Sequence, residues 1–118
     1  MKLPRQHTES DKASLSTKQM ELLASALRAR DRGLLHVHAR PQASTIARQI
    51  THAFEAAGWV VASDHATDVR SGICIHQGSA TFSHFLAVAS ILTDAGIPFT
   101  QDNSSSALRG GYVEVWVS

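Results

Sequence analysis

The sequence contains the same pattern twice, and this recurrence limits the available folds more than any single motif does. Residues 33–62 and residues 72–100 each read as a glycine, a short apolar strand, a turn, an amphipathic helix, an Ala-Gly pair and a second strand. The glycines that end the two helices, Gly58 and Gly96, lie about forty residues apart, a period typical of repeated supersecondary units. We therefore expect an internal repeat of a strand–helix–strand unit.

Helix and strand signals extend this pattern toward both ends of the chain. Ser16 or Thr17, followed by Gln19, resembles a capping box and predicts the start of a helix that Gly33 ends. Residues 1–15 are polar and show no period, which predicts a flexible N-terminal arm. The remaining periodicities predict strands at 34–39, 59–63, 73–76, 97–100 and 112–117, helices at 43–57 and 81–95, and a loop at 102–111.

These elements predict one α+β domain over residues 16–118, in the order α-βαββαββ. The segment 64–71 is too short for the crossover that joins parallel neighbours, so we expect a hairpin between the second and third strands. With right-handed crossovers, the simplest solution is a two-layer ferredoxin-like split βαβ sandwich with an N-terminal helix and an extra C-terminal strand. Its helices cover one face of the sheet. A flavodoxin-like three-layer fold is the alternative, but it needs more crossover helices.

Charge and apolar content exclude several classes of partner. The formal net charge is +1 and 18% of the residues are charged, so no overall field attracts nucleic acid or anionic membranes. No apolar run approaches the roughly 20 residues of a membrane span, and the N-terminus lacks the features of a signal peptide. We expect a cytoplasmic protein if the chain is complete, or a membrane-associated soluble domain if it was trimmed from a longer anchored parent. The single cysteine, Cys74, excludes an intramolecular disulfide.

Histidine and cysteine alternate with apolar residues on two of the expected strands. In a ferredoxin-like sheet the first and third strands are antiparallel neighbours, so these side chains should gather on the face away from the helices. Imidazole and thiolate are ligands for zinc or copper. Side chains on one face of a strand stand about 7 Å apart, however, and solvent-exposed histidines are the alternative. The candidate zinc ligands are His36, His38, Cys74 and His76.

The last strand adds aromatic side chains to the same expected face. Tyr112, Glu114 and Trp116 alternate with valines, and we expect them to border the histidines and form an interface with a protein partner or a second copy. The alternative is that Trp116 simply covers the sheet. Nucleic-acid binding is not expected, because His and Cys stand where RNA-binding sheets of similar topology place stacking aromatics.

Two further groups of polar residues can be explained either by a structural role or by a functional one. Asp64, His65 and Asp68 fall in the expected hairpin, where they could form an acidic metal or acid–base cluster or build a turn. No serine or cysteine on a recognisable elbow accompanies the Asp-His pair, so nucleophilic catalysis has no support. The basic residues that we interpret as a solvated helix end are Arg28, Arg30, Arg32 and Arg40.

The order of these parts resembles that of α/β domains in uncharacterised bacterial proteins. The resemblance covers residues 15–118 and lies in the segments LLASAL, FEAAGWVV, GICIH, LTDAGI and YVEVWV. Such domains often follow membrane-spanning segments, which implies an accessory or sensory module without catalytic residues. We expect a non-enzymatic bacterial interaction or sensory domain that self-associates as a homodimer. The alternatives are a His/Cys metal-binding protein or small enzyme using the open face, and a small-ligand-binding regulatory module.

Overall fold

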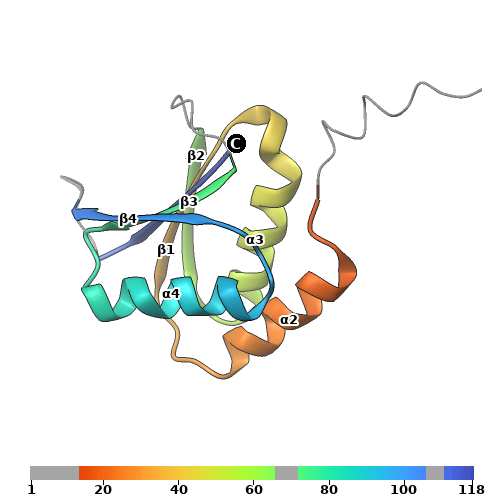
Figure 1. Cartoon of the computed structure of the whole chain (residues 1–118), viewed down its shortest axis with the longest axis horizontal. Coiled ribbons are helices and arrows are strands. Elements are labelled where there is room, and N and C mark those ends of the chain that lie inside the picture. The colour runs from red at the N-terminus through yellow and green to blue at the C-terminus, as the bar shows by residue number, and fades with distance from the viewer. Residues whose placement is uncertain (1–13, 66–71, 106–110) are drawn as a thin grey trace, which may run out of the picture.

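The computed structural model describes residues 14–65, 72–105 and 111–118 of the chain (Figure 1). Within these residues an α+β fold combines three α-helices with a five-stranded mixed sheet. Residues 1–13 of the predicted arm 1–15, together with Asp68, lie outside the described residues. Leu15, at the end of that arm, is buried, and its backbone N–H donates to Gln49 Oε1 at 2.7 Å. The elements, in chain order, are α2 (Thr17–Arg28), β1 (Leu34–Ala39), the 3-10 turn η1 (Pro41–Ala43), α3 (Ser44–Ala56), β2 (Val60–His65), β3 (Ile73–Gly78), α4 (Phe82–Asp94), β4 (Thr100–Ser105) and β5 (Val113–Val117).

The strand order corrects the ferredoxin-like prediction. The sheet runs β2-β1-β5-β3-β4, so β5 separates β1 from β3. The expected hairpin is wrong, because β2 pairs in parallel with β1, and β3 pairs in parallel with β4. The last strand is parallel to β1 and antiparallel to β3. The sheet therefore consists of two parallel βαβ units joined through β5, and it is twisted so that β4 runs across the direction of β1 and β2 (Figure 1).

The pattern of β5 explains why it lies at the centre. Its valines Val113, Val115 and Val117 are buried, and both of its edges are paired. A strand with a fully buried apolar face gains more from two neighbours and a helix layer than it does at an edge. The prediction of this strand was sound, but alternation specifies which face is buried and not which neighbours a strand takes.

Helices cover one face of the sheet. α3 packs on β1, β2 and β5, α4 packs on β3, β4 and β5, and α2 lies across both helices. Leu35 of β1 and Ile75 of β3 point into this layer and are fully buried. Leu23 and Leu27 of α2 are also buried and contribute about 2 kcal/mol each by leaving water. The remaining large, fully buried side chains include Phe54, Phe85, Ile50, Ile91, Leu92 and Ile97.

Most helix ends follow from local sequence, but the prediction that Gly33 ends the first helix was wrong, because α2 ends at Arg28 with Ala29 as its C-cap. Ser16 accepts a hydrogen bond from the Gln19 backbone N–H at 3.0 Å, and the Gln19 side chain accepts one from the Ser16 N–H at 2.8 Å, which is the capping box. α3 and α4 both end in a Schellman motif, in which Gly58 and Gly96 have φ of 92° and 71°. The closing bonds are 3.0 Å long in both helices, from the Trp59 N–H to the Phe54 carbonyl and from the Ile97 N–H to the Leu92 carbonyl.

One strand boundary was predicted wrongly. The sequence indicated a strand at 97–100 followed by a loop, whereas β4 begins at Thr100 and continues to Ser105. The polar run Gln101–Ser105 is extended because it pairs in parallel with β3 at the edge of the sheet. An edge strand has one side without a strand neighbour and does not need an apolar pattern.

Candidate metal site on the sheet face

The face of the sheet opposite the helices carries two rows of side chains. Residues that pair across strands point to the same face, so the register defines each row. The first row, from β2 to β4, is Asp64, His38, Trp116, Cys74 and Thr100, and the second is Ala62, His36, Glu114, His76 and Asp102. All four predicted zinc ligands and two of the predicted interface residues therefore share this face. They fall in two groups, because β5 lies between β1 and β3.

The first group joins two histidines of β1 to an aspartate of β2. Asp64 Oδ1 lies 2.7 Å from His38 Nδ1, and Asp64 Oδ2 lies 3.2 Å from His36 Nε2. The three side chains can each offer a ligand atom within 4.8 Å of the others. A zinc ion about 2.1 Å from tetrahedral ligands holds those atoms about 3.4 Å apart. Small side-chain rotations would therefore bring these residues to metal-binding geometry.

The electrostatics of Asp64 fit this arrangement. Burial acts to raise the pKa of the Asp64 carboxyl, but the hydrogen bond and charge of His38, followed by those of His36, outweigh it and lower the pKa below its usual value. The carboxylate form is therefore favoured at the centre of the group. A deprotonated carboxylate next to imidazoles is the state that a metal ion requires of its ligands.

The rings around His38 fix its orientation. It stacks on His36 with ring centroids 4.1 Å apart and on Trp116 with centroids 4.1 Å apart. His38 is only 6% exposed, and its Nε2 has no hydrogen-bond partner in the described part of the chain. Glu114 Oε1 lies 3.9 Å from this nitrogen, and Glu114 is 4% exposed. The stacking therefore also fixes His38 Nδ1, the ring nitrogen that lies beside Asp64.

The second group lies on β3 and β4. His76 Nε2 is 3.1 Å from Asp102 Oδ2. Cys74 is buried in the other row, where its register partners are Trp116 and Thr100. The expected cluster of four ligands therefore does not form around one point. Cys74 and His76 lie two strands away from His36 and His38.

The predicted interface residues pack against the histidines. Trp116 stacks on His38, and Tyr112 meets His36 edge to face with centroids 6.0 Å apart. Glu114 is buried between β1 and β3. Since β5 is a central strand, pairing of two copies through an exposed last strand is excluded, and the two edges of the described sheet are β2 and β4. Self-association by another surface stays a prediction.

Sequence reasoning placed Asp64 in a turn and did not group it with His36 and His38. It missed this ligand because it expected a hairpin, whereas β2 runs parallel to β1. In parallel strands the carboxyl ends meet at one edge of the sheet, and His38 and Asp64 lie next to each other there. The available signal was the strand–helix–strand pattern of residues 33–62, which by itself favours a parallel pair.

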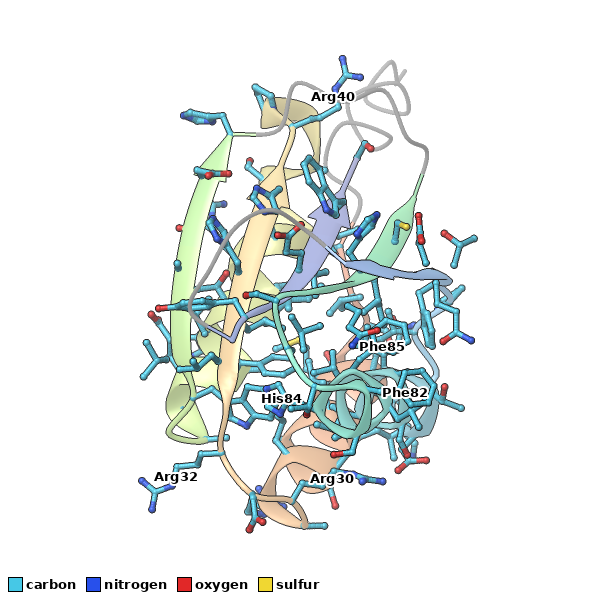
Figure 2. The ribbon with its side chains drawn as sticks, turned by 90° about the vertical axis from the view of Figure 1, so that its left-hand side faces the viewer. Arg30, Arg32, Arg40, Phe82, His84 and Phe85 are labelled. Atoms are coloured by element: carbon cyan, nitrogen blue, oxygen red, sulfur yellow. The ribbon has the colours of Figure 1, made fainter. Side chains whose placement is uncertain are left out.

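A cavity of about 560 Å³ opens at the same end of the sheet. Figure 2 shows Arg40 at this end and Arg30 and Arg32 at the opposite end. Arg40 follows β1, and Arg48 projects from α3. Neither guanidinium has an ion pair or hydrogen bond within residues 14–65, 72–105 and 111–118. The polar lining also includes Ser44, Thr51, His52, Glu55, Ser63, Asp64 and His65.

Comparisons with known proteins found no relative of this chain. No protein-family model, no curated protein and no solved structure matches the chain. Among the described residues, no helix is long and apolar enough to cross a membrane.

Proposed function

We propose that this chain is a metal-binding domain that holds a divalent transition-metal ion through His36, His38 and Asp64, as a sensory or accessory module. The observation that carries the proposal is the convergence of two imidazoles and one carboxylate within 4.8 Å on neighbouring parallel strands. Mixed nitrogen and oxygen ligands favour Zn²⁺ or Co²⁺ over Mg²⁺ or Ca²⁺. Three protein ligands also leave a coordination position for water or a ligand, and Asp64 is about half exposed on that side.

Exposed sheet histidines are the alternative explanation, and the geometry does not favour it. His38 is buried rather than solvated, and it is fixed by stacking on both faces of its ring. Ordering such side chains is unfavourable in conformational entropy unless they pack or bind. Its Nδ1 atom lies 2.7 Å from Asp64 Oδ1 and therefore faces the cluster rather than solvent.

Metal analysis of the purified protein tests the proposal. After equilibrium dialysis against Zn²⁺ or Co²⁺, we expect stoichiometric metal in the wild type, and the variants His36→Ala and His38→Ala should bind at least about tenfold more weakly. His52→Ala is the matched control, because it removes an exposed imidazole of α3 that is outside the cluster. Absence of metal from the wild type, or equal loss in all three variants, contradicts the proposal.

The proposal also includes the internal repeat that the sequence predicts. Two features support it: both units are parallel βαβ pairs, and both helices end in the same Schellman motif at Gly58 and Gly96. We propose that the two units are equivalent halves of the sheet. They are arranged about β5 in opposite directions, because β1 is parallel to β5 and β3 is antiparallel to it.

The cavity favours a second candidate function, the binding of a small anionic ligand. Arg40 and Arg48 present two positive charges to it, and the first turn of α3 adds backbone N–H groups near Ser44. Crevices at the carboxyl ends of parallel strands are the usual ligand sites of α/β sheets.

We expect inorganic phosphate to raise the Tm of the wild type but not that of an Arg40→Ala, Arg48→Ala double variant. Arg28→Ala, at the end of α2, is the control, and an equal response of all three proteins contradicts this candidate.

A further inference from the structure

We propose that the metal site and the cavity are coupled, so that a divalent ion held by His36, His38 and Asp64 strengthens the binding of a small organic anion in the cavity. The inference rests on the proposed metal-binding function and adds its regulation, because each ligand raises the affinity of the protein for the other. Arg40 and Arg48 hold the anion, and Asp64 connects the two sites.

The two sites lie on opposite faces of the same pair of strands. His36 and His38 of β1 point to the face away from the helices, whereas Val37 and Ala39, which alternate with them, line the cavity on the helix side. Asp64 of β2 belongs to both sites, since it contacts the two histidines and also lines the cavity. A charge bound at Asp64 therefore lies close enough to act on an anion in the cavity.

The size and lining of the cavity favour an organic anion. Its volume of about 560 Å³ is in the range of sites for small organic ligands and exceeds the needs of a bare inorganic ion. Arg40 lies at the carboxyl end of β1 (Figure 2), and Arg48 of α3 lines the same cavity. Guanidinium groups bind carboxylates and phosphates through paired hydrogen bonds. The apolar part of the lining consists of Val37, Ala39, Pro41 and Ala47.

The charges of the lining balance in the metal-free protein. It contains two positive and two negative side chains, together with two histidines that the formal count takes as neutral: Arg40, Arg48, Glu55, Asp64, His52 and His65. A divalent ion bound to Asp64 reverses the local charge, because its two positive charges exceed the single negative charge of the carboxylate. The cavity then has a surplus of positive charge, which attracts an anion.

Thermodynamic linkage makes this effect reciprocal. If the ion raises the affinity for the anion by some factor, the anion raises the affinity for the ion by the same factor. Charges about 8 Å apart near a protein surface change a binding constant by roughly three- to tenfold at low salt. Since the Asp64 side chain is 53% exposed, solvent screening keeps the expected coupling near the lower end, at about threefold.

Titrations with Co²⁺ and inorganic sulfate measure the coupling, because bound Co²⁺ absorbs visible light and sulfate does not precipitate it. At matched low ionic strength, saturating Co²⁺ should raise the sulfate affinity of the wild type about threefold, and saturating sulfate should raise its Co²⁺ affinity equally. In the Arg40→Ala, Arg48→Ala double variant, sulfate should leave the Co²⁺ affinity unchanged. Arg28→Ala, at the end of α2, is the control and should keep the coupling.

An Asp64→Asn variant tests the role of this charge in the absence of metal. The substitution removes one negative charge from the lining and keeps the shape of a partly exposed side chain on an edge strand. The metal-free variant should therefore bind sulfate about two- to threefold more tightly than the metal-free wild type. Equal affinities in the two proteins overturn the connection of Asp64 with the cavity.

Two sulfonates of equal charge test the organic nature of the ligand. Benzenesulfonate should bind to the wild type more tightly than methanesulfonate, because its ring covers the apolar part of the cavity lining. Equal affinities overturn the assignment of an organic ligand.

The remaining outcomes separate this inference from the proposed function. Stoichiometric Co²⁺ with a sulfate affinity that is the same with and without the ion overturns the coupling and leaves the metal-binding function intact. Absence of Co²⁺ from the wild type overturns both. Absence of sulfate binding in either state overturns the coupling and the anion site, but not the metal site. A sulfate effect on Co²⁺ that persists in the Arg40→Ala, Arg48→Ala variant overturns the cavity as the place where the anion binds.

Discussion

At Asp64, the influence of two neighbouring imidazoles exceeds that of burial, and the pKa of the carboxyl falls below its usual value. A carboxyl whose pKa is lower in the folded than in the unfolded state stabilises the fold at all pH values above the unfolded pKa, about 3.9. That contribution disappears as the pH falls through the folded pKa. Because the Asp64 side chain is 53% exposed, solvent screens its interactions and the effect is modest.

The pH dependence of an Asp64→Asn variant measures this contribution. We expect the metal-free wild type to be more stable than the variant at pH 7, and the difference to shrink as the pH is lowered below about 4. Urea unfolding at each pH gives the two free energies. Asp31→Asn is the control, since Asp31 is exposed and has no ion pair in the part of the chain that the structure describes. A difference that grows toward acid pH contradicts the linkage.

The positions of single residues show which parts of the candidate site the sequence predicted and which parts it did not. Strand alternation placed His36 and His38 on one face, because a period of two requires only one strand. It could not place Asp64 beside them, since that contact depends on the direction and register of a second strand. The contact of His38 with Trp116 depends on a third strand from the far end of the chain.

Among the helices and strands, the start of α2 and the ends of α3 and α4 were predictable from the sequence, whereas the end of α2 and the strand β4 were not. Capping boxes and Ala-Gly ends are local signals, because the bonds that they form join residues only three to five positions apart. β4 carries the polar sequence Thr100–Ser105, and its extended conformation comes from pairing with β3. Local propensity does not contain that information.

Alanine substitution at the two Schellman glycines tests how strongly the sequence fixes the helix ends. Gly96→Ala should lower the free energy of unfolding by about 1–2 kcal/mol, because its φ of 71° is left-handed and unfavourable for alanine. No atom lies within 4 Å of an added Cβ, so a steric clash does not contribute. Gly58→Ala should lose slightly more, since its Cβ would lie 2.5 Å from Cδ of the flexible Arg32 side chain. Thermal unfolding should show a Tm lower by roughly 4–8 °C for each variant.

Asparagine at the same position supplies the control for backbone strain. It tolerates the left-handed region better than alanine, so Gly96→Asn should cost less than Gly96→Ala although its side chain is larger. If the two variants are equally stable, or if alanine has no effect, the left-handed conformation does not limit the stability of this helix end.

The sequence predicted which residues of the domain form the core, but it did not predict the order of the strands in the sheet. The buried faces of β1, β3 and β5 follow from alternation. The neighbours of β5 do not, because alternation along one strand does not specify which strands pair with its two edges. The position of β5 places Glu114 between His36 and His76.

Cross-linking with the chain's single cysteine tests this strand order directly. Cys74 of β3 is the register partner of Trp116 on the antiparallel strand β5, and partners in such pairs have Cα atoms about 4.5–5.5 Å apart, within the range of a disulfide. We expect a Trp116→Cys variant to form an intramolecular disulfide under mild oxidation, detected by a mass loss of two hydrogen atoms. Ala62→Cys is the comparison, because the hairpin prediction places β2 beside β3 whereas the structure separates them by two strands. A disulfide in Ala62→Cys and none in Trp116→Cys would restore the hairpin and remove Glu114 from its place between the histidines.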